Sequence, residues 1–372
     1  MRADVVIVGA GVYGSALAWE LARRGREVLV LEANAIASGA SGGPGRRGVR
    51  ANGRDVRELP LMHRAYEIWP TLSDMLDADT GFARIGHLEL AEQPEAVARA
   101  SARCAQQQRH GIPTELVDGA QLRALEPEVA DSVLLALYCP LDGVADHTAT
   151  TRAFARAAER CGARFREGTR VAQLVTDAAR VRAVLTADGD RIEVGSAVVV
   201  VANQGVAELI APLGSRLPTF PVLPQVLVTE PLARPVVRHL IGHLHRRLAM
   251  KTLDDGAVMI TGGWLGVWNA ERGVGETVPD AVAGNFADAV AVYPCLAGTE
   301  IALAVADRSE SVTPDLVPII DRVPIAPNCL FATGWSGHGW AIAPAVAELM
   351  AMWLIEGDRP ALLGPFALSR FV

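Results

Sequence analysis

Cysteine is scarce in this chain of 372 residues and shows no pairing pattern. No CxxC pair occurs, and the five cysteines lie far apart in the sequence: Cys104, Cys139, Cys161, Cys295 and Cys329. A disulfide scaffold and a zinc knuckle both need closely spaced cysteines, so neither is indicated. Reduced thiols of this kind fit a cytoplasmic protein best.

Long apolar runs and a strong charge of one sign are also missing. The longest strand-like apolar run covers residues 197–202, far short of the roughly 18 to 20 residues that cross a bilayer. A strand already begins at residues 3–8, which leaves no room for a secretion signal. With 35 basic and 42 acidic residues, the net charge of -7 gives no general attraction to nucleic acid or anionic membrane. We therefore expect a cytoplasmic protein that binds no nucleic acid and has no membrane span.

The N-terminus contains the complete pattern of a dinucleotide-binding unit. Residues 5–33, VVIVGAGVYGSALAWELARRGREVLVLEA, predict a buried strand, a GxGxxG turn, an apolar-periodic helix and a second strand. Gly9 permits the tight turn, Gly11 lets the backbone approach a pyrophosphate, and Gly14 lets the helix pack closely on the strand. Glu32 ends the second strand, where its carboxylate can accept both hydroxyls of an unphosphorylated ribose. The unit predicts dinucleotide binding and by itself leaves NAD and FAD open.

Two further segments distinguish these nucleotides. Residues 37–55, ASGASGGPGRRGVRANGRD, predict a loop with no strand pattern, whereas nicotinamide enzymes usually continue with further strand and helix units. A loop of small residues can run close beneath an extended ligand. Near the C-terminus, residues 313–324 (TPDLVPIIDRVP) and a strand at 329–334 precede WSGHGWAIAPAVAELMAMWLI, where a Gly-rich turn begins a helix. A second helix N-terminus can therefore face a polar edge of the ligand.

Taken in order, these segments resemble the D-amino-acid oxidase (DAO) family of FAD-dependent oxidoreductases. The branch is the one with sarcosine oxidase, glycine oxidase and the catalytic subunits of amino-acid dehydrogenases. The resemblance rests on GAGVYG with Glu32, ASGASGG, GARFREGTRVAQLV, RVRAVLTADGDRIEVGSAVVVVANQG, TPDLVPIID and GWSGHGWAIAP, and spans nearly the whole chain. It implies that the nucleotide is FAD.

The resemblance also implies an α/β fold with two discontinuous domains, which suits a chain of this length. A Rossmann-like FAD-binding domain of the glutathione-reductase type would comprise residues 1–85, 140–215 and 316–372. A second, mixed-sheet α+β substrate domain would comprise residues 86–139 and 216–315. The residue pattern agrees, because it predicts one helix and six strand-like stretches, at 94–111 and at 164–175, 180–187, 191–194, 197–202, 220–229 and 257–262.

The FAD contacts follow from the same resemblance. Backbone N–H groups of residues 337–340 could face the flavin pyrimidine edge; the alternative is a plain helix-capping turn with Ser336 as cap. Arg308 stands where sarcosine oxidases have the cysteine that attaches flavin covalently, so noncovalent FAD is expected. The implied cofactor-binding residues are Gly9, Gly11, Val12, Tyr13, Gly14, Glu32, Ala33, Ser38, Ala40, Ser41, Gly42, Arg47, Val171, Ala202, Asn203, Gly334, Gly337, His338, Gly339, Trp340 and Ala341.

The implied reaction is oxidation of the C–N bond of a small amine or amino acid. A hydride passes to flavin N5, and water hydrolyses the resulting imine. Secondary-amine, N-methyl and D-amino acids are the leading substrates. Two alternatives stay open, namely a flavoprotein of the same fold that oxidises a 2-hydroxy acid, and a noncatalytic FAD-carrying subunit of a multi-subunit dehydrogenase. The electron acceptor would be oxygen, a quinone or a partner subunit in a hetero-oligomer.

Four residues are the candidates for catalysis. They are Arg50, Arg47, His338 and Lys251. The two arginines match arginines that relatives place near the flavin and the substrate carboxylate, and a guanidinium fork suits a carboxylate. The alternative is that they are solvated loop arginines, which is our expectation for Arg46 and Arg54. His338 is either an acid or base near the flavin or a hydrogen-bonded structural histidine.

The chain departs from the family pattern at three positions. Ala341 replaces a lysine that pairs with the substrate carboxylate in the sarcosine oxidase branch. Glu310 stands where relatives have an aromatic residue or arginine, and could meet a cationic substrate or be surface charge. Met259 replaces a lysine that helps oxygen react, although nearby Lys251 could serve instead. The third departure slightly favours a dehydrogenase over an oxidase.

Two other groups of residues are ambiguous. His239, His243 and His245 could share one helical face and bind a metal, but no carboxylate supports them in sequence, so we expect no metal site. Trp264 and Trp268 could line the substrate cavity or pack between sheets.

Overall fold

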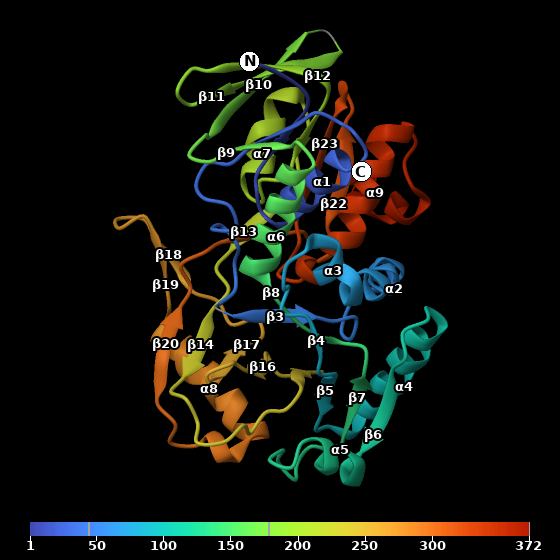
Figure 1. Ribbon diagram of the computed structural model, residues 1–372. Helices are drawn as coiled ribbons and strands as arrows, with labels where there is room; N and C mark the ends of the chain where they lie inside the picture. Colours follow the sequence, from blue (N-terminus) through green and yellow to red (C-terminus); the bar gives the residue numbers. More distant parts are fainter. Residues whose placement is uncertain (44, 178, 372) are drawn as a thin grey trace.

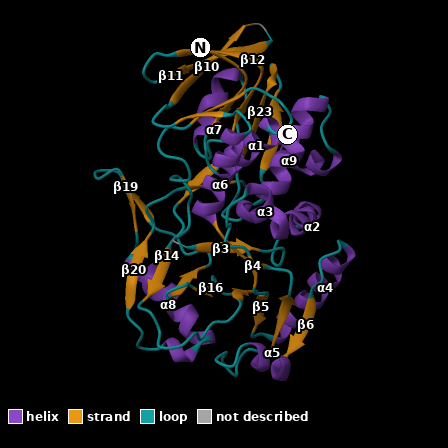
Figure 2. Ribbon diagram, viewed as in Figure 1, coloured by secondary structure: helices purple, strands orange, loops and turns teal. Residues whose placement is uncertain are grey.

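Two eight-stranded sheets lie at opposite ends of the molecule, and smaller sheets and helices lie between them (Figure 1, Figure 2). The computed structural model describes residues 1–43, 45–177 and 179–371. Pro44, inside the loop predicted at 37–55, lies outside the described residues. Both chain ends lie in the half of the molecule that contains the first sheet (Figure 1).

The first sheet has a parallel centre in the strand order β23-β12-β1-β2-β9. The inner strands β1, β2 and β12 contain continuous apolar runs, as expected where both faces of a sheet are covered. In β1, Val5 and Ile7 pack into one core and Val6 and Val8 into the other. β22 pairs antiparallel with β23 at one edge, and the β10–β11 hairpin pairs antiparallel with the start of β12. The strands are β1 (Arg2–Val8), β2 (Val28–Leu31), β9 (Arg164–Arg166), β10 (Val171–Asp177), β11 (Arg180–Thr186), β12 (Arg191–Val200), β22 (Ile319–Val323) and β23 (Ala326–Thr333).

Helices α1 (Val12–Ala22), α6 (His147–Arg160) and α9 (Ala343–Glu356) share the first core with this sheet. The stretch Gly339–Glu356 is apolar and long enough to cross a membrane, with a mean hydropathy of 1.3. The expectation that no run reaches this length was therefore wrong. Because 72% of the stretch is buried and α9 packs on α1, its apolar composition is that of a core helix.

The second sheet has the strand order β20-β14-β17-β16-β15-β5-β7-β6 and is mostly antiparallel. One face packs on α8 (Pro279–Val292), and residues of the other face line a cavity. Its strands are β5 (His87–Ala91), β6 (Glu115–Asp118), β7 (Leu135–Cys139), β14 (Val226–Thr229), β15 (Leu240–His243), β16 (Ala249–Thr252), β17 (Val258–Thr261) and β20 (Ile301–Val305).

A three-stranded sheet lies between the two large ones (Figure 1). It contains β3 (Arg46–Val49), β8 (Gly143–Asp146) and β4 (Ala83–Arg84). β3 lies within residues 37–55, so the expectation of a loop without any strand was wrong there. The sequence of β3, RRGV, has no apolar alternation, and its pairing partner β8 is remote in sequence, so this strand could not be seen locally.

The remaining elements are two short strand pairs and further helices. β13 (Phe220–Val222) pairs with β21 (Glu310–Val312), and β18 (Val267–Asn269) pairs with β19 (Val274–Glu276). The helices are α2 (Leu59–Ile68), α3 (Leu72–Leu76), α4 (Pro94–Arg109), α5 (Gly119–Leu125) and α7 (Gly205–Ile210). The predicted strands 164–175 and 220–229 are each divided in two. The predicted domain boundaries stay a prediction.

We expect Gly14→Ala to lower the free energy of unfolding of the apoprotein by about 1–3 kcal/mol, the usual cost of overpacking. The reason is that its Cβ would lie 1.9 Å from the carbonyl oxygen of Gly9. Urea denaturation followed by circular dichroism measures the change. Gly11→Ala is the matched control, because its Cβ would meet nothing within 4 Å. Equal midpoints for the two variants would contradict this close approach of α1 to β1.

Candidate functional site

A cavity of about 1000 Å³ is lined by residues from both large sheets and from the small sheet between them. Most residues predicted to contact FAD line it, including the glycine turn, the loop 37–43 and the turn 335–340. Gly14, Gly334 and Ala341 do not. Gly14 packs against Gly9, Gly334 lies against Thr313, and Ala341 is buried in the first core.

The glycine turn fits a dinucleotide phosphate. Gly9 has a φ of +106°, and a Cβ there would lie 2.8 Å from the carbonyl oxygen of Val201. Gly11 lines the cavity with nothing within 4 Å of its Cβ position, so its backbone is open to a ligand. It is also the N-cap of α1, and no side chain caps this helix end. Unpaired N–H groups at a helix start bind phosphate well.

Glu32 follows β2 and lies at the cavity wall. Its two carboxylate oxygens accept the backbone N–H groups of Ala10 at 2.7 Å and Asn34 at 2.9 Å. These bonds fix the carboxylate and leave each oxygen a second lone pair. The residue can therefore still accept hydroxyl groups of a ribose.

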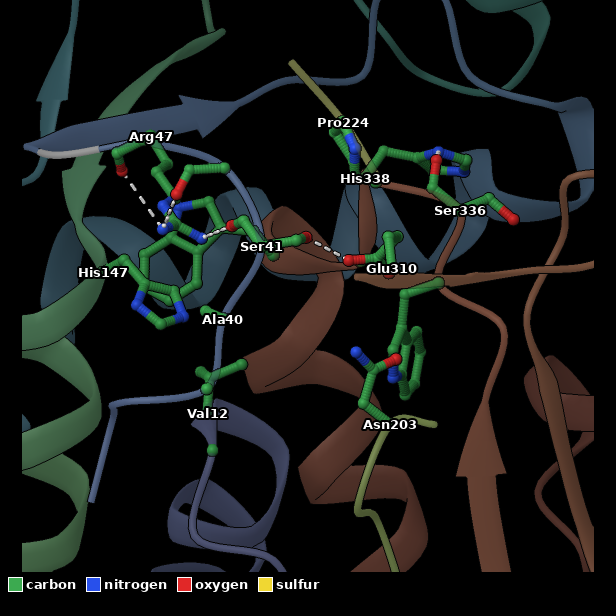
Figure 3. A pocket seen from close by; sticks show the side chains of 18 of the residues that line it. Val12, Ala40, Ser41, Arg47, His147, Asn203, Pro224, Glu310, Ser336 and His338 are labelled. Atoms are coloured by element: carbon green, nitrogen blue, oxygen red, sulfur yellow. Dashed lines mark hydrogen bonds between the residues drawn. The ribbon is translucent and has the colours of Figure 1, made fainter. Parts of the chain in front are cut away.

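Arg47 on β3 holds the small-residue loop (Figure 3). Its guanidinium donates to the carbonyl oxygens of Ser41 at 2.5 Å, Gly42 at 2.7 Å and Gly43 at 3.2 Å. Burial and the charge of Arg308 lower its pKa to about 10. Because the guanidinium fork is occupied by the loop, Arg47 shapes the cavity wall.

Arg50 follows β3 and is buried at the cavity. One guanidinium nitrogen donates to the carbonyl oxygen of Asn52. Burial, and then the positive charge of Arg54, lower the pKa of Arg50, while the carboxylates of Glu89 and Asp142 oppose the shift. No carboxylate forms an ion pair with Arg50 among the described residues, so its charge is available to an anionic group in the cavity.

Arg54 is buried, so the expectation that it is solvated was wrong. Its side chain is 1% exposed and pairs with Glu58, which is fully buried, at 3.0 Å. It also donates to the carbonyl oxygen of His338 at 2.5 Å. Arg54 and His338 are far apart in the sequence, which gives no indication that they meet, so this contact could not be predicted.

His338 completes this network. Its Nε2 lies 3.0 Å from the second oxygen of Glu58, and its Nδ1 lies 3.0 Å from the carbonyl oxygen of Ser336. Burial raises the pKa of the Glu58 carboxyl, but the charge of Arg54 and the hydrogen bond from His338 outweigh this and lower it overall. Both ring nitrogens of His338 are thus engaged within the protein, which favours a structural role in holding the turn.

The turn 335–340 supplies fewer free N–H groups than predicted. The N–H of His338 donates to the carbonyl oxygen of Trp335 at 3.0 Å, and the N–H of Gly337 is directed at Glu310. Ser336 does not cap the helix, because its hydroxyl donates to the carbonyl oxygen of Gly334 at 3.2 Å.

Lys251 is the only lysine of the chain and is buried at the cavity wall. It lies on β16 directly opposite Met259 on β17. Burial, followed by the positive charge of Arg47, lowers its pKa to about 7, against a smaller opposing effect of Asp254. The amine is therefore close to half-neutral near pH 7.

His147 is a cavity residue that the sequence reasoning missed (Figure 3). It begins α6 and is buried, with its ring centroid 4.9 Å from that of Trp340. Burial and the charges of Arg47 and Arg308 lower its pKa to about 3. Asp146 predicts a helix start here, because its side chain accepts the Ala149 N–H, but no local pattern shows that His147 faces the cavity.

The helical face that His239, His243 and His245 could have shared does not form. Residues 240–243 are the strand β15 and not part of a helix. His239 instead contacts Glu126 at 2.7 Å. The three histidines therefore do not act as one group.

His243 and His245 meet a carboxylate, Glu92, so the expectation that none was nearby was wrong. Their ligand atoms lie within 4.8 Å of one another, close enough to surround a metal ion. However, Nδ1 of His243 accepts the N–H groups of His245 and Arg246 at 3.3 and 3.2 Å, which leaves the proton on Nε2. Arg246 also donates to Glu92. Because these lone pairs are already used, we propose no metal here.

The two tryptophans do not line the cavity. Trp268 is 60% exposed on the hairpin of β18 and β19. Trp264 lies over α8, where a Cβ at Gly284 would come within 2.2 Å of its ring, and its indole N–H donates to Asp288 at 3.1 Å. Both of the alternatives given for this pair were therefore wrong.

Comparison with known protein families gives a match over most of the chain. The family model described as "FAD dependent oxidoreductase" (DAO) matches residues 4–353. The chain is 27% identical to a sarcosine oxidase subunit beta of Arthrobacter sp., covering 99% of this chain and 91% of that protein. It is 28% identical to a D-amino acid dehydrogenase of Cereibacter sphaeroides, covering 96% and 92%.

Solved structures agree with these sequence relatives. L-proline dehydrogenase from P. horikoshii superposes with a TM-score of 0.91 at 26% identity, over 100% of this chain and 98% of that one. Glycine oxidase from Geobacillus kaustophilus has the same fold, with a TM-score of 0.86 at 23% identity, over 100% and 99%.

We expect the amine of Lys251 to titrate near pH 7 and well below its ordinary value of 10.5, because burial and Arg47 disfavour its charged form. Reductive methylation with 13C-formaldehyde labels only this side chain and the N-terminus, and the 13C shift gives the midpoint. Lys251→Gln assigns the two resonances by removing one. A Lys251 midpoint near 10 would show that the amine is hydrated.

Proposed function

The chain belongs to the DAO family of FAD-dependent oxidoreductases, and we propose that it oxidises the C–N bond of a small amine or amino acid. The observation that carries this proposal is the single cavity that joins a dinucleotide turn to a charged, buried pocket on the second sheet. The relatives named for sarcosine, D-amino acids and proline support the same reaction. None of them supports oxidation of a 2-hydroxy acid.

Different cavity residues would hold different parts of FAD. The turn Gly9–Gly11 and the start of α1 would hold the pyrophosphate, and Glu32 would bind the ribose. Arg47 keeps the loop 37–43 in the shape that lies along the cofactor. FAD supplies the hydride acceptor, N5 of its ring system. We propose that FAD binds noncovalently and that the two domains comprise the residues predicted from the sequence.

The substrate side of the cavity has its own residues. Arg50 would bind a carboxylate with charge-assisted hydrogen bonds, which positions the carbon next to the amine. Val226, Val228 and Met259 form an apolar patch on the second sheet that excludes water. Lys251 faces the same space and would donate or hold a proton there, since its amine exchanges protons near pH 7.

The electron acceptor and the assembly belong to the same proposal. Met259 in place of a lysine slightly favours a dehydrogenase that passes electrons to a quinone or partner subunit. Names such as "subunit beta" among the relatives support a hetero-oligomer. The buried charges around the cavity favour a catalytic chain over a subunit that merely carries FAD. We propose a cytoplasmic location.

Anaerobic titration of the purified protein tests the reaction. The panel holds D-amino acids, N-methyl amino acids and cyclic imino acids, with matched 2-hydroxy acids as controls. We expect one of the amines to bleach the flavin absorption band and the hydroxy acids to leave it unchanged. A band that persists with every amine would refute amine oxidation by the isolated chain.

We expect Arg50→Ala to lower kcat/KM for the active amino acid by roughly 30- to 150-fold, the equivalent of about 2–3 kcal/mol of lost charge-assisted hydrogen bonding. Bound flavin should be retained. Arg46→Ala is the matched control, because Arg46 is half-exposed and pairs with Asp254 at the surface. Steady-state kinetics of both variants decide the matter, and unchanged kinetics for Arg50→Ala would remove Arg50 from the site.

Acid precipitation should release all of the flavin into the supernatant. Arg308 offers no nucleophile where sarcosine oxidases use a cysteine, so no covalent bond is expected. Absorption spectra of supernatant and pellet measure the distribution. Yellow protein in the pellet would contradict noncovalent binding.

A further inference from the structure

Glu310 is a buried carboxylate that lines the cavity (Figure 3). It begins β21, lies opposite Val222 of β13, and is 6% exposed. Ser41 donates its hydroxyl to one carboxylate oxygen, and the N–H of Gly337 is also directed at this group. The two donors come from the loop and the turn that line the cofactor side of the cavity.

No cationic side chain pairs with Glu310 within the described part of the chain. Glu89, a second buried carboxylate that lines the cavity, pairs with Arg103 at 2.7 Å, and the nearby buried Glu58 pairs with Arg54. A buried carboxylate that receives only neutral donors is costly as an anion. A cationic ligand would offset that cost.

The charged and titratable groups around Glu310 come from several elements. Arg47 of β3 and His338 of the turn are close enough to favour its charged form but do not contact it. The negative charge of Glu310 contributes to the raised pKa of Tyr13 on α1. Burial outweighs these effects and raises the pKa of Glu310, which makes this carboxylate a better proton acceptor than an exposed one.

We propose that Glu310 binds the ammonium group of the substrate and accepts its proton, an inference that rests on the amine oxidation proposed above. One N–H bond of the ammonium breaks and an O–H bond to the Glu310 carboxylate forms. The electron pair stays on nitrogen, where it becomes available for the C=N bond of the imine product. A protonated amine lacks this pair, so the proton must leave before oxidation.

This assignment sets the substrate class. With Arg50 available to an anion and Glu310 to a cation in one cavity, the site suits a zwitterion that has an ammonium group and a carboxylate. Ser41 orients the carboxylate of Glu310 and ties this recognition to the loop that Arg47 holds. Glu310 therefore adds a proton acceptor to the site.

Two probes that differ by one charge test the binding step in the FAD-loaded protein. Trimethylammonioacetate cannot lose a proton, and 3,3-dimethylbutanoate has carbon in place of its nitrogen. We expect calorimetry to show that the wild type binds the cationic probe roughly 10- to 100-fold more tightly, the size of a charge-assisted contact. Equal affinities, or no binding of the cationic probe, would overturn the inference without any need for a variant.

Glu310→Gln assigns the preference to this residue, since glutamine keeps an oxygen for Ser41 and removes the charge. We expect the preference to vanish in this variant. Asp307→Asn is the matched control: Asp307 is close in sequence, its side chain is 61% exposed, and the change in net charge is the same. A preference that survives in Glu310→Gln, or vanishes in Asp307→Asn, would show that another group recognises the cation.

The proton step has a separate readout in the pH dependence of flavin bleaching at limiting amine. Between the pKa of Glu310 and that of the amine, the wild type should show no tenfold rise per pH unit, because it binds the ammonium form. Titration of Lys251 near pH 7 affects the wild type and the variant alike. Glu310→Gln should bind only neutral amine, so its rate should rise about tenfold per pH unit. A flat profile in the variant would refute proton transfer to Glu310. If no amine bleaches the wild type, amine oxidation fails, while the two probes still decide cation binding.

Discussion

The close approach of α1 to β1 is the constraint on which the site depends. Gly14 has no room for a Cβ beside Gly9, so the helix begins directly above the end of the strand. That packing leaves Gly11 bare at the cavity and directs unpaired N–H groups toward it. Every other part of the cofactor side, from Glu32 to the small-residue loop, is arranged around this helix start.

The charged residues of the cavity fall into two groups, those that are bound by other groups of the protein and those that have no charged partner. Arg47 uses its guanidinium on three carbonyl groups of one loop, and Arg54 is neutralised by Glu58. Arg47 holds the loop that precedes it in sequence, and Arg54 also binds the distant turn at His338. Both guanidinium groups therefore have little capacity left for a ligand. Arg50 and Glu310 differ, because neither has a charged partner in contact within the described residues. The positions with unmatched charge are the ones where substrate recognition is expected.

The sequence predicts an element correctly where neighbouring residues alone determine its structure. The turn after β1, the helix after it and the apolar strand β12 follow from residues adjacent in sequence. The error at Arg54 has a different cause: its spacing from Glu58 was visible, but its burial arises from contact with His338. β3 was missed for the same kind of reason, since its pairing partner β8 is remote in sequence.

The sequence by itself determined the dinucleotide turn with its flanking strands and helix, because glycine spacing and apolar periodicity are local properties. The family followed from a resemblance that spans nearly the whole chain. Only the tertiary structure decided which charged side chains bind other groups of the protein and which are available in the cavity. It placed Lys251 opposite Met259, brought His147 to the cavity wall and left Glu310 without an ion-pair partner among the described residues. Burial and charge pairing are set by segments that meet only after folding, so one stretch of sequence cannot specify them.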